Sequence, residues 1–262
     1  MRSWERTDKP IVLAHRGGAD EYPENSVQAF EGMRAQGFNY IETDAQATSD
    51  GVLILIHDPL LDRTTNGSGE ISQVSWAEVS QLRDESGHAP MTVKAALDGF
   101  PDIDFNIDAK VDGTVEPMIE LLRGSDYLDQ VLVAAFSEKR LRRIRTAVPG
   151  VATSLGTSGV ARLVLASILP SFLSDLVMKA VPGPSDGAAC VQMPMNFHGV
   201  RILSKKLIDI AHGHGLAVHI WTINEVKDMI EILDMGADGI ITDRPSLARE
   251  LIENRDKQAQ EP

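Results

Sequence analysis

The chain has 262 residues, of which 38 are Asp or Glu and 25 are Lys or Arg, so its formal net charge is −13. This acidity makes general nucleic-acid binding and electrostatic docking on anionic lipid unfavourable. Hydrophobic residues make up 43% and charged residues 24%, which is typical of a folded globular protein and argues against disorder.

The length and composition predict one domain spanning residues 1–262, with a core at about 11–250, because no Gly-Ser or proline-rich linker divides the chain. The single cysteine, Cys190, rules out an intrachain disulfide and is compatible with the cytoplasmic location that we expect. The longest uncharged apolar stretch, 163–174, contains Pro170 and is too short to span a membrane. We therefore expect a buried or pocket-lining helix there and no stable membrane insertion.

Short apolar runs, rich in β-branched and aliphatic residues, alternate with amphipathic stretches along the chain. Each run is too short for a helix and is typical of a strand. The eight predicted strands are residues 11–15, 40–44, 103–108, 131–135, 151–155, 190–193, 217–221 and 239–242. Eight β–α alternations at about 33 residues each predict a TIM (β/α)₈ barrel of the α/β class. A doubly wound open sheet is the alternative.

Several of the intervening stretches begin with a residue that favours a helix N-cap. The predicted caps, each followed by apolar residues at helical spacing, are Asn25, Ser137, Ser204 and Asn224. As an N-cap, Asn25 would direct a helix N-terminus, which attracts anions, toward the end of the first strand.

A loop insertion after the second strand interrupts this alternation. Residues 51–57 follow a Ser-Asp-Gly turn and predict a short return strand, so that the second strand and the return strand form a hairpin. Residues 58–90 then show little apolar periodicity and many turn residues. We expect this insertion to extend over one mouth of the barrel, because long loops in compact domains are usually functional.

Two predicted strands carry charged side chains on one face. Alternate residues of a strand share a face, so Glu42 points the same way as Asp44, and Asp108 the same way as Lys110. Inside a barrel, buried carboxylates need a cation or a proton. Oxygen ligands of this kind suit Mg²⁺, Ca²⁺ or Mn²⁺. The alternatives are that the carboxylates lie at a solvated strand end or that they pair with Lys110 and Arg16.

Two histidines end predicted strands on what would be the catalytic face of a barrel. His15 ends the first strand and His57 ends the return strand, and two imidazoles could serve as general acid and general base near neutral pH. Hydrogen-bonded structural roles are the alternative. Arg16, followed by two glycines, could contact a phosphate. Trp221 ends the seventh strand and is a candidate substrate contact or a core residue.

Ordered motifs connect these candidates. They are His-Arg-Gly-Gly at 15–18, Pro-Glu-Asn-Ser at 23–26, Ile-Glu-Thr-Asp at 41–44, His-Asp at 57–58, Asp-Ala-Lys at 108–110 and Ile-Thr-Asp-Arg-Pro at 241–245. In this order they resemble the glycerophosphodiester phosphodiesterase family over about residues 11–250. The resemblance implies a TIM barrel that uses a divalent cation, Mg²⁺, Ca²⁺ or Mn²⁺, to cleave a small-molecule glycerophosphodiester into an alcohol and sn-glycerol 3-phosphate.

The resemblance also implies roles for single residues. It implies that His15 and His57 are the acid/base pair and that the insertion helps to form the pocket. The implied metal ligands are Glu42, Asp44 and Asp108, and the implied phosphate contacts are Arg16 and Lys110. The family usually has glutamate at the position of Asp108, so the metal choice and affinity are less certain than the reaction class.

Two other functions remain open at this point. A lysophospholipid could be cleaved at the same phosphodiester, with the apolar stretch 163–181 around its acyl chain; an outer barrel helix with its loop is the other interpretation of that stretch. A catalytically silent, phosphate-binding barrel is the second alternative. The presence of both histidines and all three carboxylates argues against it.

Overall fold

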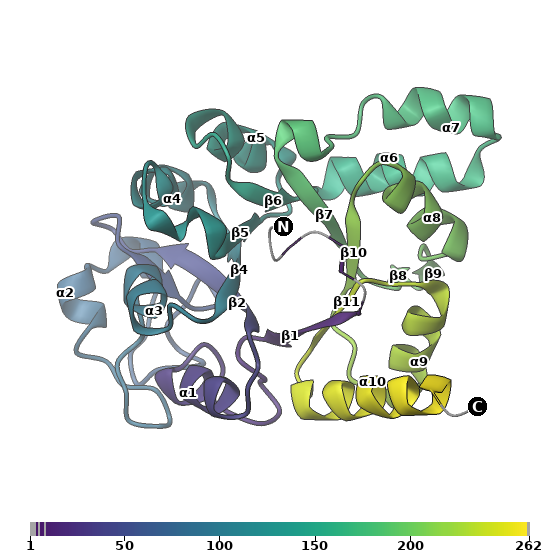
Figure 1. Ribbon diagram of the computed structural model, residues 1–262. Coiled ribbons are helices and arrows are strands. Elements are labelled where there is room, and N and C mark those ends of the chain that lie inside the picture. The colour runs from purple at the N-terminus through teal and green to yellow at the C-terminus, as the bar shows by residue number, and fades with distance from the viewer. Residues whose placement is uncertain (1–3, 5, 8, 261–262) are drawn as a thin grey trace.

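Eight parallel strands close into a ring in the computed structural model, which describes residues 4, 6–7 and 9–260 (Figure 1). In ring order the strands are β1 (Ile11–His15), β11 (Gly239–Thr242), β10 (Ala217–Ile220), β7 (Ala188–Met193), β6 (Ala152–Ser154), β5 (Val131–Ala134), β4 (Asp104–Ala109) and β2 (Tyr40–Ala47). Strand β1 pairs with both β11 and β2. Because this ring has no edge strand, the TIM-barrel prediction is confirmed and the open sheet is excluded. The predicted strand ends differ from the observed ones by at most three residues.

Helices surround the ring (Figure 1). They are α1 (Val27–Ala35), α2 (Trp76–Val79), α3 (Val93–Gly99), α4 (Val115–Leu122), α5 (Glu138–Ala147), α6 (Thr157–Ile168), α7 (Ser171–Met178), α8 (Lys205–Gly213), α9 (Val226–Met235) and α10 (Pro245–Gln260). Short 3₁₀ turns are η1 (Ile71–Gln73), η2 (Asp112–Thr114), η3 (Asp126–Asp129) and η4 (Pro184–Asp186). None of the helices in the described ranges has the length and apolar character needed to cross a membrane.

Successive side chains of a strand point alternately into the barrel and toward the surrounding helices. Leu13, Leu132 and Ile241 point inward and form one cluster with Trp4. The ring of Trp4 packs edge-on against Tyr40, the first residue of β2, with 5.5 Å between centroids. The N-terminal end of the barrel is therefore filled by apolar and aromatic side chains, and polar groups of the interior lie nearer the other end.

The insertion after β2 is more structured than its sequence pattern indicates. The predicted return strand is confirmed as β3 (Leu53–Leu55), which pairs antiparallel with β2. Residues 58–90 contain η1 and α2, and they share an apolar cluster with β3 that includes Ile54, Leu61, Ile71 and Val79. A second, unpredicted hairpin joins β8 (Asn196–Phe197) and β9 (Val200–Arg201) after β7.

Two of the four predicted N-caps are confirmed. The hydroxyl oxygens of Ser137 and Ser204 accept backbone hydrogen bonds at the starts of α5 and α8. Asn25 and Asn224 are not caps, because their side chains bind other residues at the barrel mouth. Ser26 caps α1 instead, so the expected helix N-terminus behind Asn25 begins one residue later.

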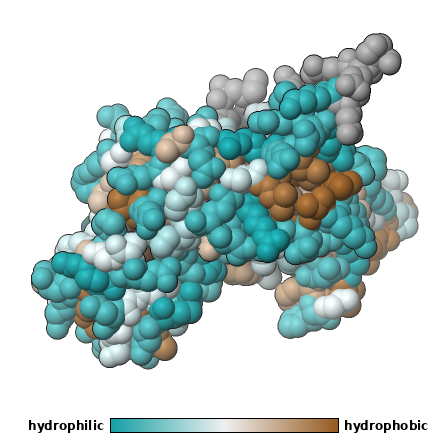
Figure 2. All heavy atoms as spheres, turned by 90° about the horizontal axis from the view of Figure 1, so that it is seen from below, coloured by the Kyte–Doolittle hydropathy of each residue, from teal (hydrophilic) through white to brown (hydrophobic). Residues whose placement is uncertain are grey.

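The expectation of one buried or pocket-lining helix at 163–174 is wrong. The stretch is divided between α6 and α7 on the outside of the ring, as the outer-helix interpretation predicted, and several of its large apolar side chains are exposed (Figure 1). Pro170 precedes α7 and separates the two helices, because proline lacks the amide proton that a continuous helix would need. On another side of the molecule, that of α1 and α10, the surface is mostly hydrophilic with one larger apolar area (Figure 2).

Candidate active site

Carboxylates from β2 and β4 lie together inside the barrel. Asp44 is the register partner of Asp108, and Glu42 is the register partner of Asn106. Partners in parallel strands carry their side chains on the same face. Glu42, Asp44 and Asp108 are only 8%, 1% and 7% exposed, so the structure brings together the three predicted metal ligands.

Lys110 lies between two of these carboxylates. Its Nζ atom is 2.7 Å from Asp44 Oδ1 and 2.7 Å from Asp108 Oδ2. Burial alone would lower the pKa of Lys110, but Asp108 and Asp44 raise it above its usual value. Burial alone would raise the pKa of Asp44, but the charges of Lys110 and Arg16 hold it below its usual value. The site thus contains an ionised buried cluster.

Glu42 is less well compensated. Burial first, and the nearby charge of Asp44 second, raise the pKa of Glu42 to about 7. Its Oε2 atom is 3.8 Å from His15 Nε2 and has no hydrogen-bond partner among the described residues. A carboxyl group with this pKa accepts a proton or a cation near neutral pH.

Unpartnered oxygens of three residues test whether a divalent cation fits here. Glu42 Oε2, Asp108 Oδ1 and Asn106 Oδ1 are buried without a hydrogen-bond partner in the described part of the chain. Their oxygen chemistry suits a hard cation. Within residues 4, 6–7 and 9–260, however, no three His, Cys, Asp or Glu side chains form a ready-made metal cluster. The donors fit the cation, while the pairing with Lys110 and Arg16 that we considered as the alternative is the arrangement observed.

His15 is held by a carboxylate from the opposite end of the chain. Its Nδ1 atom is 2.6 Å from Asp243 Oδ1, and the other oxygen of Asp243 accepts a 2.7 Å hydrogen bond from Asn224 Nδ2. Burial alone would lower the pKa of His15, but the hydrogen bond with Asp243 and the charges of Glu42 and Asp243 raise it. His15 therefore favours the protonated form, with Nε2 directed toward Glu42.

His57 has a similar support from the insertion. Its Nδ1 atom is 2.7 Å from Asp58 Oδ1, and Asp58 Oδ2 accepts a 2.5 Å hydrogen bond from Arg63 Nε. These bonds from Arg63 and His57 hold the pKa of Asp58 well below its usual value. Arg63 also donates to Glu24, which Arg16 contacts, so His57 is connected to the buried cluster through Asp58, Arg63 and Glu24. Both histidines thus have Nδ1 engaged and Nε2 available.

Arg16 connects the first loop to the buried cluster. Its backbone has φ = 52°, a left-handed conformation that costs energy for any residue except glycine. Its Nε lies 3.2 Å from Asp44 and its Nη1 lies 3.2 Å from Glu24. Glu24 also accepts two 2.7 Å hydrogen bonds from Arg63. The predicted phosphate contact thus lies at the site, within an ion network that reaches the insertion.

Asn25 fixes the same loop on β2. Its backbone is also left-handed, with φ = 53°. Its Nδ2 donates a 3.2 Å hydrogen bond to Asp44 Oδ2, and its Oδ1 accepts a 2.7 Å bond from the hydroxyl of Thr43. The side chain predicted to cap a helix instead holds a proposed metal ligand in place.

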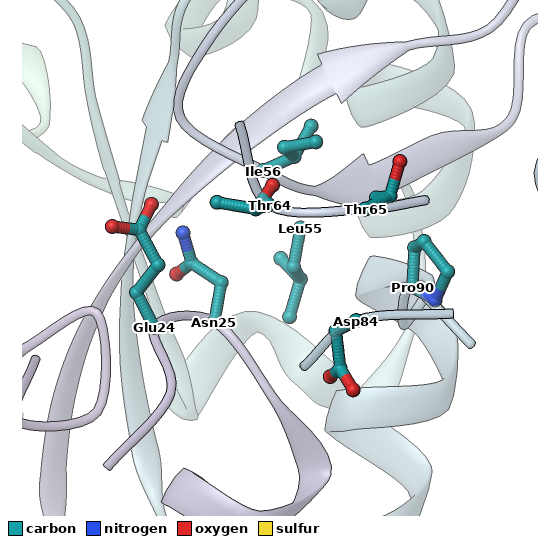
Figure 3. A pocket seen from close by; sticks show the side chains of 8 residues that line it. All are labelled: Glu24, Asn25, Leu55, Ile56, Thr64, Thr65, Asp84 and Pro90. Carbon is teal, nitrogen blue, oxygen red and sulfur yellow. The ribbon is translucent and has the colours of Figure 1, made fainter. Parts of the chain in front are cut away.

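A pocket separates the first loop from the insertion (Figure 3). Glu24 and Asn25 line one side, and Thr64, Thr65 and Asp84 line the others. The two histidines are not among its lining residues. The pocket adjoins the site through Glu24 and Asn25, because these residues contact Arg16 and Asp44.

Two aromatic side chains, Trp221 and Phe136, pack together where strands β10 and β5 end. Trp221 directly follows β10 and is partly exposed, and its ring packs edge-on against Phe136 with 6.0 Å between centroids. Phe136, close behind β5, is 58% exposed. The predicted substrate contact at Trp221 is thus partly exposed and lies against the exposed ring of Phe136.

Sequence analysis assigned no supporting role to the residues that hold the two histidines in place: Asp243, Asn224, Asp58, Arg63 and Glu24. A signal existed for Asp58, which is adjacent to His57, and for Asp243, which follows β11 at the catalytic face. Spacing could not pair His15 with Asp243, because 228 positions separate them.

Comparisons with known proteins agree with this geometry. The model of the glycerophosphoryl diester phosphodiesterase family matches residues 15–247. A probable glycerophosphodiester phosphodiesterase of Mycobacterium tuberculosis is 34% identical, over 92% of this chain and 90% of that protein. A human lysophospholipase D is 24% identical, over 92% and 86%. The structure of an Oleispira antarctica phosphodiesterase in complex with sn-glycerol 3-phosphate superimposes with a TM-score of 0.73 at 22% identity, over 94% of this chain and 97% of that one.

Proposed function

The chain belongs to the glycerophosphoryl diester phosphodiesterase family, and from this premise we propose that it hydrolyses glycerophosphodiesters to an alcohol and sn-glycerol 3-phosphate. The observation that carries the proposal is the placement of two carboxylate-supported histidines beside one buried ion cluster. His15 Nε2 lies 3.8 Å from Glu42 Oε2. His57 is bound to Asp58, and Asp58 is bound to Arg63, which shares Glu24 with Arg16 of the cluster. A phosphodiester bound at this cluster would have an imidazole available on either side, as proton transfer in phosphodiester cleavage requires.

We assign opposite starting roles to the two histidines. His15, whose pKa is raised, starts protonated and acts as the general acid through Nε2. His57, with Nδ1 bound to Asp58, acts as the general base through Nε2. His57 removes the proton from a glycerol hydroxyl of the substrate, whose oxygen attacks phosphorus. The bond to the leaving alcohol breaks, and that oxygen takes the proton of His15.

The second half of the reaction reverses these roles. The first half leaves a cyclic phosphate, a deprotonated His15 and a protonated His57. His15 then removes a proton from water, the water oxygen attacks phosphorus, and His57 protonates the glycerol oxygen as the ring opens. Both histidines return to their starting states, so the cycle consumes only water and the diester.

The cationic side chains and a divalent ion would share the phosphate charge. Glu42, Asp44 and Asp108 are the residues that would hold the ion, and bound there it would polarise the phosphoryl oxygens. Arg16 and Lys110 orient the phosphate and offset negative charge that develops in the transition state. In its present position Lys110 pairs with Asp44 and Asp108, so we propose that substrate and cation binding redirect its ammonium group toward the phosphate.

The direct test is product release from glycerophosphocholine. The purified protein should release sn-glycerol 3-phosphate, EDTA should abolish the release, and Mg²⁺, Ca²⁺ or Mn²⁺ added back should restore it. Asp108→Ala should raise the metal concentration needed for half-maximal activity. Release that persists in EDTA would contradict the metal role alone. No release from any glycerophosphodiester would favour the silent, phosphate-binding barrel.

A lysophospholipid is the second candidate substrate, and the pair of the exposed Phe136 and the partly exposed Trp221 favours it. These rings could contact the first part of an acyl chain on a diester whose phosphate lies among the histidines. Phe136→Ser should then lower kcat/KM for lysophosphatidylcholine and leave kcat/KM for glycerophosphocholine unchanged. Equal effects on both substrates, or none, would argue against an acyl-chain contact at these rings.

A further inference from the structure

Helices α6 and α7 form a pair whose exposed surface is apolar. They lie side by side and extend away from the ring at the upper right of Figure 1, and α7 packs chiefly against α6. The pair holds five of the large apolar side chains that are exposed in the described part of the chain, namely Leu165, Ile168, Phe172, Leu173 and Leu176. Such a concentration on one element usually marks an interaction surface.

The amphipathic pattern of α7 is inverted, and α6, which buries Leu163, exposes Leu165 and Ile168 near its C-terminus. Helix α7 buries Ser174 and Met178, whereas Phe172 and Leu176 are 71% and 62% exposed. Ile168, the last residue of α6, is 74% exposed. A helix that only covered the barrel would direct its larger apolar residues inward. The described residues therefore leave these apolar side chains without cover.

The α6–α7 segment has a slight excess of basic residues, in contrast to the chain as a whole. Residues 157–182 contain Arg162 and Lys179 but one acidic residue, Asp175. Lys206 of α8 reaches the connection between the helices, where its Nζ donates a 2.8 Å hydrogen bond to the carbonyl of Leu169. The net charge of −13 therefore does not describe this segment, in which basic residues outnumber acidic ones.

We propose that the α6–α7 face binds reversibly to the surface of an anionic lipid bilayer. Phe172 and Ile168 enter the boundary between headgroups and acyl chains, and Arg162, Lys179 and Lys206 approach the lipid phosphates. Apolar insertion combined with basic side chains is the pattern of interfacial helices. The proposal concerns peripheral docking, and it is independent of the proposed reaction.

A second copy of the chain fits this face less well. In a two-fold symmetric dimer the same surface meets itself, so Arg162, Lys179 and Lys206 would approach the same three cations of the partner. Anionic lipid satisfies both the apolar side chains and the cations.

Vesicle flotation tests the proposal with the full chain. We expect the protein to bind vesicles of phosphatidylcholine with phosphatidylglycerol, and to bind vesicles of phosphatidylcholine alone about tenfold more weakly. Ile168→Ser combined with Phe172→Ser should lower the partition coefficient on the mixed vesicles at least about tenfold. Arg162→Gln with Lys179→Gln should lower it about tenfold on mixed vesicles only.

A matched control uses exposed apolar residues elsewhere. Leu60→Ser with Val226→Ser changes side chains that are 44% and 40% exposed, and it should leave partitioning unchanged. Circular dichroism and Tm verify that each variant is folded. The proposal is overturned if the wild type binds neither vesicle, if the α6–α7 variants bind as the wild type does, or if sedimentation shows a dimer that Phe172→Ser dissociates.

Discussion

Two regions of the molecule depart from the usual distribution of side chains. The barrel interior at β1, β2 and β4 buries charged groups, whereas the outer surface of α6 and α7 exposes large apolar groups. The interior holds carboxylates such as Asp44, which is 1% exposed, while the exterior holds Phe172, which is 71% exposed. Each departure leaves polar or apolar groups poorly satisfied in the protein alone. The difference lies in how each is compensated within the chain.

In the interior, the protein itself supplies most of the compensation. Lys110, Arg16 and Asn25 contact the buried carboxylates, and Asp243 contacts His15. On α6 and α7, the described residues supply no cover for the exposed apolar groups. The charged groups of the interior are therefore compensated mainly by other residues of the chain, whereas the apolar groups of the outer face depend on an external partner. The four changes below test this distinction, from the largest expected effect to the smallest.

Removing either histidine should affect the interior most strongly. We expect His15→Ala and His57→Ala each to lower kcat for a glycerophosphodiester by about 10²- to 10⁴-fold, because each removes one of two proton-transfer groups. Steady-state kinetics with glycerophosphocholine measures this loss. The exposed His198 is the matched control, and His198→Ala should retain activity. Wild-type turnover in either site variant would remove that histidine from the mechanism.

His219 is a second buried histidine. Unlike His15, it has no hydrogen bond to a carboxylate among the described residues. It is 1% exposed, its Nδ1 lies 3.3 Å from Gln192 Nε2, and burial lowers its pKa from the ordinary 6.5 to about 4. Between these values the unfolded chain binds a proton that the native chain does not, so stability is lost as the pH falls from 6.5 to 4.

The expected contribution of His219 to this loss is about 3 kcal/mol. Urea unfolding of the wild type and of His219→Leu, measured at several pH values from neutral to pH 4, gives the difference directly. The variant should show a flatter dependence by about that amount. Parallel curves for the two proteins would mean that His219 takes up its proton in the native state as readily as in the unfolded state.

Asp243→Asn should have a smaller effect than removal of His15. The amide keeps an acceptor for His15 Nδ1 but removes the charge that raises the pKa of His15. We expect kcat to be about tenfold lower. The high-pH limb of the kcat/KM profile should move to lower pH, because the general acid His15 loses its proton at a lower pH. Asp20→Asn, which changes an exposed ion pair with Arg244, is the control. A loss of kcat without a shifted limb would indicate a purely steric role.

The smallest effect is expected on α6 and α7. Ile168→Ser or Phe172→Ser should change the free energy of unfolding by less than about 0.5 kcal/mol, because both side chains are mostly exposed. Leu163→Ser, in the same helix as Ile168, should lower the free energy of unfolding by more than about 2 kcal/mol, because Leu163 is fully buried. Denaturant unfolding compares them. A large loss at Ile168 would show that the protein itself buries this side chain in solution.

The fold was largely predictable from local pattern. Apolar runs of four to six residues mark β1, β5 and β11 because a strand buried on both faces is almost continuously hydrophobic. The polar alternation of β4 likewise predicts that Asp108 and Lys110 share a face. The first residues of α1 and α9 were less predictable, because Asn25 and Asn224 have cap-like sequence positions but bind Asp44 and Asp243.

The candidate site was predictable in its groups but not in their connections. The motifs identify His15, His57 and Glu42 one by one. The hydrogen bond between His15 and Asp243 depends on closure of the ring, which places β1 beside β11. The apolar stretch at 163–174 misled the prediction, since hydrophobicity alone does not distinguish a buried helix from one that faces outward.

The sequence by itself determined the strand pattern, the acidic balance and the chemical groups available, because these follow from residue type and spacing along the chain. The tertiary structure decided which groups meet. Ring closure joined residues from opposite ends of the chain, low exposure of Glu42 moved its pKa toward 7, and the packing of α6 against α8 left an apolar face outside. Burial and proximity are properties of the assembled barrel, and no single stretch of sequence carries them.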